Sequence, residues 1–496
     1  MAQVEPHDLL SETHPRNGGE SKDAAAWMML FWLLPPILAL AQLWVTWRLG
    51  DRIAYEEIAE SVRDPYWLGR GALYDRGSPN VAWYAAMLGL YKTFGFHLHL
   101  ARVFRLILHV LSITSVAWLF KRLLGVKRAL VPLCAFALSP SLLFFNGMQT
   151  SYGSDLQLVP ICLVLLVLIP AASLARSLVL QALCWSLAMV GALAYPAFAM
   201  LYPTLGIAYL VVVRRFCADK HWSIHFASLL VGGLAFVLTF VGFAALLRDP
   251  SPLWQGAFRG GAGGFSTSPA FILANLGRTF RELFERGESY YFVDLPKVEF
   301  SGGLGALSAC LAIVTSALVA RDRKLRLFLV LAWLTILTTL AISATATHLP
   351  GLRRQTPVLG AFYVLYALAW HQLGLGQKRA PLVRVLAFML LLLPVHHLIV
   401  LPENAAHGRG DGFSPVGTQP TVYLRDLTAK ATTEEVELRC PSPSLFKCRY
   451  PEVFAAVAGA CEWNHLRCQP VQGYDPKTAR FVPLSTALWE TYYFSH

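Results

Sequence analysis

The stretch from Gly50 to Arg105, GDRIAYEEIAESVRDPYWLGRGALYDRGSPNVAWYAAMLGLYKTFGFHLHLARVFR, directly follows the first long apolar run of the chain. It opens with Asp51, at the point where the chain leaves a bilayer, and returns to the membrane at Arg102. Three more acids follow Asp51 within about three helical turns: Glu56, Glu57 and Glu60. Acids at a membrane exit, backed by a long loop rich in aromatic residues, Pro and Gly, predict a functional site rather than a tether.

The composition predicts a polytopic all-α membrane protein. Of the 496 residues, 55% are hydrophobic and only 15% are charged, whereas about a quarter are charged in soluble proteins. Several apolar runs reach the roughly 20 residues that a helix needs to cross hydrocarbon. The net charge of +12 does not indicate a nucleic-acid partner, because Lys and Arg collect on the cytoplasmic side of membrane proteins and no nucleic-acid-binding motif accompanies them.

Hydropathy predicts about eleven membrane spans. Their approximate limits are 27–47, 103–120, 129–146, 156–171, 178–195, 197–213, 225–247, 303–320, 327–344, 358–372 and 385–402. Tyr195-Pro196 is the only break between the fifth and the sixth span. With a cytoplasmic N-terminus, the short non-cytoplasmic connections hold only two basic residues, Arg353 and Arg354. This asymmetry predicts a cytoplasmic N-terminus and a non-cytoplasmic C-terminus. The expected membrane is a bacterial inner membrane.

This topology divides the chain into three parts. Residues 1–25 are expected to be a disordered cytoplasmic tail, 26–402 the membrane domain, and 403–496 a small non-cytoplasmic region. Two long non-cytoplasmic loops interrupt the membrane domain, at 50–102 and 248–302. The second loop contains the Gly-rich run 259–265, a flexible lid or linker without the Gly-Lys-Ser/Thr of a phosphate loop. Its segment Phe271–Phe284 has helical periodicity and is expected to lie along the membrane surface.

The nine cysteines fall into two groups. Five lie in or near apolar spans, where Cys usually acts as a small buried hydrophobe: Cys134, Cys162, Cys184, Cys217 and Cys310. The other four, in the C-terminal region, lack the close pairs of a zinc site and lie in an oxidising compartment, so they predict two disulfides. Three pairings are possible. The short loops favour Cys440–Cys448 and Cys461–Cys468, because such loops close readily.

Two acids are candidates for catalysis, Asp51 and Asp155. Asp155 begins another span on the same side of the membrane, after Asn146-Gly-Met-Gln-Thr-Ser-Tyr-Gly-Ser. Each has a simpler explanation, since Asp51 can be a helix-end charge among headgroups and Asp155 a charge favoured by a helix N-terminus. For Glu60 the simpler explanation is a solvated helix face. Two carboxylates brought together at one membrane face can activate an acceptor hydroxyl or hold a divalent cation.

The motif Asp51-Arg-Ile-Ala-Tyr55-Glu-Glu57 resembles the opening of the first loop in GT-C membrane glycosyltransferases. The loop continues with Gly77-Ser-Pro79, Phe94-Gly95 and Arg102, as in the branch of protein O-mannosyltransferases and lipid A aminoarabinose transferases. Ser139-Pro140 and Asp155 resemble the second acidic region of that family, and 348–357 loosely resembles its Arg/Pro loop near the lipid phosphate. The resemblance covers roughly residues 27–215. Arg52 stands where the family has a second acid, and Ser78 where a basic residue often precedes the proline.

The resemblance implies a GT-C-like helical bundle and a reaction. A sugar moves from a polyprenyl-phosphate-linked donor to a hydroxyl of a lipid, glycan or protein acceptor. Asp51 and Asp155 take the catalytic roles, with a divalent metal ion as a candidate cofactor between them. The expected substrate-binding residues are Tyr55, Glu57, Arg102, His348, Arg353 and Arg354. If the segment is helical, Tyr55 shares the face of Asp51, and the arginine pair suits phosphate because its fork is bidentate.

Two other classes of function remain open. A transporter or lipid flippase needs polar or charged residues buried at mid-membrane. Charges are nearly absent from the middle of the spans, and the polar residues gather at one face. A non-catalytic scaffold subunit of the same fold is compatible with Arg52. An assay of sugar transfer from polyprenyl-phosphate donors separates these alternatives.

Overall fold

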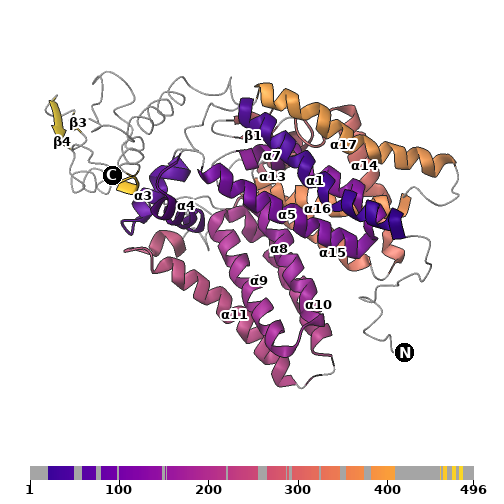
Figure 1. Ribbon diagram of the computed structural model, residues 1–496, viewed down its shortest axis with the longest axis horizontal. Helices are drawn as coiled ribbons and strands as arrows, with labels where there is room; N and C mark the ends of the chain where they lie inside the picture. The colour runs from indigo at the N-terminus through magenta and orange to yellow at the C-terminus, as the bar shows by residue number, and fades with distance from the viewer. Residues whose placement is uncertain are drawn as a thin grey trace.

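The computed structural model confirms a helical membrane protein (Figure 1). It describes residues 21–49, 59–73, 80–97, 100–147, 151, 153–218, 220, 222–254, 265–285, 287–289, 293–295, 297–322, 325–346, 354–373, 381–407, 459, 462–465, 472–475 and 480–483. Several predicted site residues lie outside these ranges: Asp51, Tyr55, Glu57, His348, Arg353, Cys440, Cys448, Cys461 and Cys468.

Long helices follow the predicted spans. They are α1 (Ser21–Leu49), α5 (Leu100–Leu124), α6 (Val126–Ala137), α7 (Pro140–Gly147), α8 (Ser154–Leu168), α9 (Leu174–Ala194), α10 (Tyr202–Phe216), α11 (Trp222–Ala244), α14 (Gly302–Ser316), α15 (Arg326–Thr345), α16 (Thr356–Leu373) and α17 (Pro381–His407). The long loops carry η2 (Ala59–Arg63), α3 (Asp64–Leu68), α4 (Val81–Phe94) and α13 (Pro269–Phe284). Two antiparallel pairs of short strands, β1 (Gly287–Ser289) with β2 (Val293–Leu295) and β3 (Gln472–Asp475) with β4 (Arg480–Pro483), were not predicted.

Eight of the described helices are long and apolar enough to cross a membrane. These are α5, α8, α9, α10, α11, α14, α15 and α17, some with a short terminal extension. Helices α1, α6 and α16 occupy the positions of the three other predicted spans, so the count of eleven stays a prediction. The chain is an integral multi-pass membrane protein.

The predicted span 129–146 is wrong as a single helix, because the chain breaks between α6 and α7. Leu138 leaves the helix with φ −94° and ψ 6°. Ser139 then begins α7, since its Oγ accepts a hydrogen bond of 3.2 Å from the backbone N–H of Leu142. Pro140 at the first position lacks an N–H that would be unpaired there. The break at Tyr195-Pro196 is confirmed, because a 3₁₀ turn (Pro196–Leu201) separates α9 from α10.

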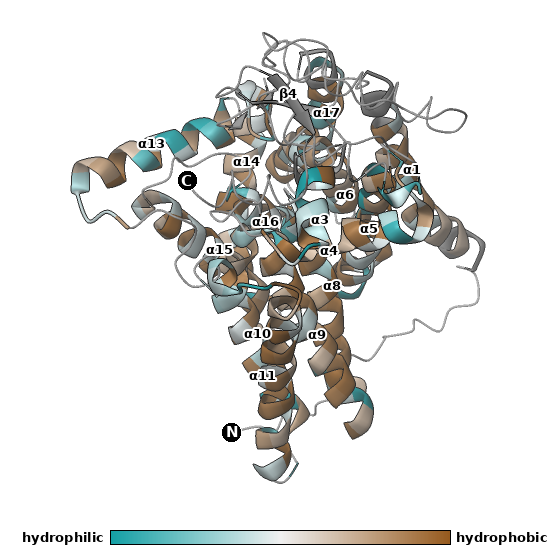
Figure 2. Ribbon diagram, turned by 90° about the vertical axis from the view of Figure 1, so that its left-hand side faces the viewer, coloured by the Kyte–Doolittle hydropathy of each residue, from teal (hydrophilic) through white to brown (hydrophobic). Residues whose placement is uncertain are grey.

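The packing of the helices leaves apolar side chains exposed on the outside of the bundle, where lipid can cover them. Helix α9 packs between α8 and α11, and α14 packs between α16 and α17 (Figure 1). Helix α11 exposes large apolar side chains, among them Phe226, Leu230 and Leu238, and Figure 2 shows apolar residues along α9 and α11. A helix that is apolar all round is stable when lipid covers it.

The described part of the first long loop packs against the helix bundle. Its α4 packs against α9, and buried aromatic residues of the loop, including Trp83 and Tyr91, form one cluster with Met189 of α9 and Phe240 of α11. The described residues of this loop, 59–73 and 80–97, therefore pack on the bundle.

Three C-terminal residues close over this loop, and we call Glu462, Trp463 and Asn464 the tail clip. Trp463 stacks on Tyr91 with ring centroids 4.7 Å apart. Asn464 Oδ1 accepts a hydrogen bond of 2.6 Å from the backbone N–H of Phe96, and Glu462 pairs with Arg70 at 2.8 Å. The tail clip therefore ties the C-terminal region to the first long loop.

Helix α13 confirms the predicted helix at 271–284. Its buried side chains fall on one face, Asn275, Thr279, Glu282 and Leu283, and it packs against α15. The Asn275 amide donates to the carbonyls of Ala344 and Ala346 at 3.3 and 3.0 Å, so it caps the end of α15. Figure 2 shows hydrophilic residues along α13.

Candidate functional site

Asp155 lies in the first turn of α8, with 1% of its surface exposed. Gly153 adopts a left-handed conformation (φ +73°) just before the helix, and a side chain there would contact the Phe145 ring at about 3.2 Å. Oδ1 of Asp155 accepts a hydrogen bond of 2.8 Å from the Thr356 hydroxyl. Its Oδ2 has no hydrogen bond to any described residue. A buried carboxylate with one oxygen left over is suited to accept a proton or a ligand.

The partner of Asp155 comes from the predicted phosphate loop. Thr356 begins α16, directly after Arg354 and Gln355. Gln355 is fully buried, and its amide donates to the Ser343 hydroxyl of α15 at 2.8 Å. Arg354 is half-buried. The structure thus joins the second acidic region of the sequence to the end of the Arg/Pro loop.

Arg105, which the sequence analysis missed, is the cation beside this carboxylate. It is fully buried in α5, where its Nη2 donates to the carbonyl of Phe145 at 3.3 Å. Its guanidinium lies 5.5 Å from the Trp83 ring centroid and interacts electrostatically with Asp155. A buried charge is stable only when other groups compensate it. The carboxylate of Asp155 is one of the groups that compensate the guanidinium of Arg105.

Arg105 belongs to a buried polar stripe on α5, made of Arg102, Arg105, His109 and Ser112. The spacing of three and four residues places them on one helix face, and this spacing was the signal in the sequence. Ser112 donates to the carbonyl of Leu156 in α8 at 3.0 Å. His109 lies about 13 Å from the start of α5. Neither of its ring nitrogens has a hydrogen bond within the described residues. Arg102, which the sequence predicts as a substrate-binding residue, is the first member of this stripe.

The first long loop contacts the residues just before Asp155 and the start of α5. Asn80, just before α4, donates to the hydroxyl of Ser151 at 3.0 Å in a buried contact. Trp83 of α4 packs on Phe104 of α5, with centroids 5.8 Å apart. Ser151 precedes Asp155 in the turn between α7 and α8, so the loop that carries the acids of the sequence motif is packed against the turn that carries the second acid.

The described residues do not form a metal site on their own. No group of three or more His, Cys, Asp or Glu side chains comes together among them. Asp155 offers one free carboxylate oxygen, and its proposed partner Asp51 lies outside the described ranges. Only one predicted metal ligand can therefore be placed.

The contacts bring together Asp155, Thr356, Arg105 and the loop residue Asn80 at one end of the bundle, which we call the site end. It consists of the starts of α5, α8 and α16 and the end of α7. It offers a buried carboxylate, a guanidinium and several hydroxyls. These groups can accept a proton from a hydroxyl and stabilise an anion.

Solved structures show which fold this is. The chain is similar to ArnT from Cupriavidus metallidurans bound to undecaprenyl phosphate, with a TM-score of 0.52 and 13% identity over 88% of each chain. It is equally similar to the apo state of ArnT, with coverage of 89% of this chain and 85% of that one. An oligosaccharyltransferase from Archaeoglobus fulgidus is less similar, with a TM-score of 0.45 and 11% identity over 93% of this chain and 61% of that one. No protein-family model and no curated protein matches the sequence.

The likeness to ArnT extends over most of both chains and shows a shared fold. The shared fold agrees with the resemblance of the first loop of the sequence to that of GT-C glycosyltransferases.

Proposed function

We propose that the chain is a membrane glycosyltransferase that moves a sugar from a polyprenyl-phosphate-linked donor to an acceptor hydroxyl at the non-cytoplasmic face. The observation that carries the proposal is the buried, half-satisfied carboxylate of Asp155 at the site end of a bundle with the ArnT fold. ArnT in the similar structure is bound to undecaprenyl phosphate, which supports a polyprenyl-phosphate lipid as the carrier here.

The proposed reaction is a single displacement. The acceptor oxygen attacks the anomeric carbon, the bond from that carbon to the phosphate oxygen breaks, and the phosphate leaves with the bonding electrons. A carboxylate takes the proton of the acceptor hydroxyl. We propose Asp51 as this base and Asp155 as the second acid, which binds and orients the acceptor through its free oxygen.

The remaining residues have binding roles in this proposal. Tyr55 and Glu57 line the path of the acceptor, and Arg102 and His348 contact the donor. Arg353 and Arg354 bind the phosphate, because a planar guanidinium pairs with two phosphate oxygens at once. Arg105 interacts electrostatically with Asp155 and stabilises its charged form.

Asp51 and Asp155 are also the proposed ligands of a divalent cation, which would neutralise charge on the leaving phosphate. Of this pair, only Asp155 belongs to the described residues, and no further ligand accompanies it there. The proposed proton transfer and displacement use only side chains of this chain.

Transfer assays with the purified protein and polyprenyl-phosphate sugars test the proposal. We expect Asp51→Asn to lose about 10²–10⁴-fold in rate, the usual contribution of general-base catalysis. Glu60→Gln is the matched control, as an acid of the same segment predicted to be solvated, and should keep full activity. Full activity of Asp51→Asn would refute the assigned base.

The same preparation separates the other classes. Movement of a labelled lipid between leaflets of proteoliposomes, without any transfer of sugar, would indicate a flippase. Neither transfer nor movement with a broad set of donors would indicate a non-catalytic subunit.

A further inference from the structure

Glu299, just before α14, is a second buried carboxylate, and it contacts the start of α7, the end of that helix opposite the site end. It has no exposed surface. Oε1 accepts hydrogen bonds from the Ser139 hydroxyl at 2.6 Å and from the backbone N–H of Ser141 at 3.0 Å. Oε2 accepts one from the Ser141 hydroxyl at 2.7 Å. Three such bonds offset the loss of water around a buried carboxylate.

These three bonds hold the first turn of α7. Ser139 and Ser141 flank Pro140, the first residue of that helix, and the N–H of Ser141 is one of the groups that an isolated helix leaves unpaired. A carboxylate at this position also interacts favourably with the helix dipole. Glu299 therefore caps α7 from a segment about 160 residues away in sequence.

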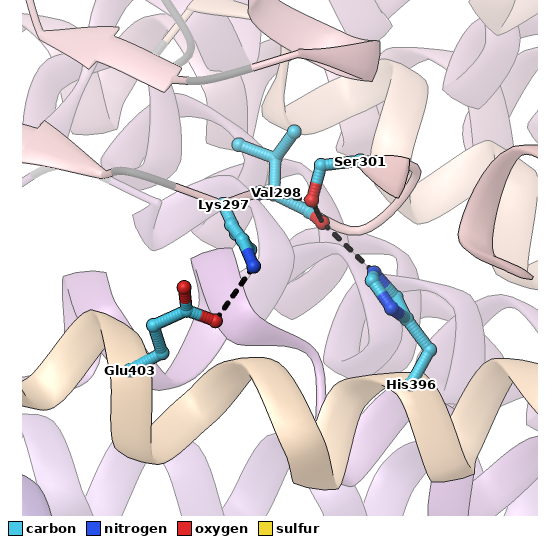
Figure 3. Close-up of polar contacts among 5 residues, drawn as sticks. All are labelled: Lys297, Val298, Ser301, His396 and Glu403. Carbon is cyan, nitrogen blue, oxygen red and sulfur yellow. Dashed lines mark hydrogen bonds and ion pairs between the residues drawn. The ribbon is translucent and has the colours of Figure 1, made fainter. Parts of the chain in front are cut away.

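The segment that carries Glu299 is itself fastened to α17, as Figure 3 shows. Lys297 pairs with Glu403 at 2.7 Å, in a half-exposed contact. Ser301 donates its hydroxyl to the carbonyl of Val298 at 2.9 Å, and a ring nitrogen of His396 lies 3.4 Å from the same carbonyl. The buried contacts of Val298 and Ser301 hold the backbone beside Glu299, whereas the Lys297–Glu403 pair is half-exposed.

The other end of α7 contacts two parts of the candidate site, Arg105 and the segment just before Asp155. Arg105 donates to the carbonyl of Phe145 in its last turn, and the Phe145 ring lies against Gly153, two residues before Asp155. Helix α7 has eight residues and a length of about 12 Å. Glu299 therefore holds the helix at one end and Arg105 holds it at the end nearest Asp155.

We propose that Glu299 is a positioning residue, which acts through α7 to hold the turn that presents Asp155. It is not a candidate base, because both of its oxygens are already bonded to α7. The proposal rests on the proposed function of Asp155. Glu299 belongs to the second long loop, whereas the proposed base Asp51 belongs to the first. The proposal therefore gives both loops a role in the reaction.

The test compares Glu299→Ala with Lys297→Ala, a change in the same segment that removes a half-exposed ion pair. We expect Glu299→Ala to lower kcat about 10–100-fold, as small misplacements of reacting groups do, with the KM for the donor unchanged. Lys297→Ala should leave both unchanged. In an Asp155→Asn background, Glu299→Ala should add no further loss, because its effect passes through Asp155.

Glu299→Gln provides a variant of the same size if Glu299→Ala does not fold. Its amide oxygen can still accept from Ser139 and Ser141, so it should retain more activity than Glu299→Ala. Normal kcat in folded Glu299→Ala, or a full additional loss in the Asp155→Asn background, would overturn the proposal.

Hydrogen exchange tests the positioning role without requiring that the protein transfers sugar. The backbone N–H groups of Ser154 and Leu156 bond to the carbonyls of Ser151 and Gly153, and we expect Glu299→Ala to speed their exchange while Lys297→Ala does not. Unchanged exchange in Glu299→Ala refutes the positioning role even if the wild-type protein transfers no sugar. Absence of transfer by the wild type, with faster exchange in Glu299→Ala, refutes the proposed function alone.

Discussion

The hydroxyl of Thr356 donates a hydrogen bond of 2.8 Å to Asp155 across 201 residues of sequence. Both residues are buried and both begin a helix, α16 and α8. The bond fixes one oxygen of the carboxylate, and the other has no hydrogen bond to any described residue. The region that resembles a phosphate-binding loop and the region that resembles an acidic motif thus meet through these two side chains.

Thr356→Val keeps the shape of the side chain but removes this donor. We expect a loss of about 1–3 kcal/mol in unfolding free energy, the penalty for a buried polar group left unpaired, and a lower transfer rate. Thr356→Ser keeps the hydroxyl and should stay near wild type in both. Thermal unfolding and transfer assays measure the two effects, and equal behaviour of Thr356→Val and wild type would show that the bond contributes nothing.

Arg353→Ala and Arg354→Ala should each weaken donor binding by about tenfold or more, because a hydrogen bond to a charged group contributes about 1.5–3 kcal/mol. Arg353→Lys should also bind less tightly, since an ammonium cannot make the bidentate contact. Arg278→Ala, an exposed arginine of α13, is the control. Unchanged affinity in both alanine variants would mean that these arginines only reach the lipid headgroups.

Trp463→Ala should release the tail clip from the first long loop. The side chain is 6% exposed and stacks on Tyr91, so its removal should cost about 3–5 kcal/mol of local stability. We expect faster hydrogen exchange at the N–H of Phe96, with Trp463→Phe intermediate. Trp222→Ala, at a site 70% exposed, should not change this exchange. Slow exchange in Trp463→Ala would contradict the role of the clip.

Gly191→Ala should destabilise the bundle by about 1–3 kcal/mol, as overpacking does. A Cβ at Gly191 would lie 2.5 Å from the ring of Phe198, which is fully buried and cannot move aside. Gly206→Ala, in α10, meets nothing within 4 Å and should be neutral or slightly stabilising. Melting in detergent compares the two, and a neutral Gly191→Ala would show that the α9–α10 turn adapts.

Mass mapping without reductant tests the cysteines. We expect Cys440, Cys448, Cys461 and Cys468 to be oxidised, each short loop contributing roughly 2–3 kcal/mol to local stability in the chain-entropy model. The five cysteines of the membrane helices are free and should react with an alkylating reagent after unfolding. Nine alkylated cysteines would contradict the prediction.

The helices could be predicted because their signal is local. Apolar runs of span length and breakers such as Ser139-Pro140 are visible in the sequence, and the structure has a helix at every predicted span. The division of 129–146 at that dipeptide was missed, because hydropathy averages over a window wider than one capping residue. The short strands were missed because three or four residues give too little periodicity.

The partners of the site could not be predicted, because they depend on tertiary contacts. Asp155 was found from its place at the start of a span. The residues around it come from distant helices: Thr356 lies 201 residues away, and Glu299 meets Ser139 across 160. Nothing in the local sequence of Thr356 or Glu299 distinguishes them from ordinary loop residues. Only the spacing of Arg102, Arg105 and His109 on one helix face carried a local signal.

The tail clip also sets an order of events during biosynthesis. The backbone of Phe96 bonds to a residue 368 positions later, so at about 5–20 residues per second the ribosome delivers that partner about 20–75 s after the loop itself. During that interval the Tyr91 ring lacks its stacking partner. A chain truncated before Glu462 would keep its long apolar helices but would leave Tyr91 and the backbone of Phe96 without their C-terminal partners.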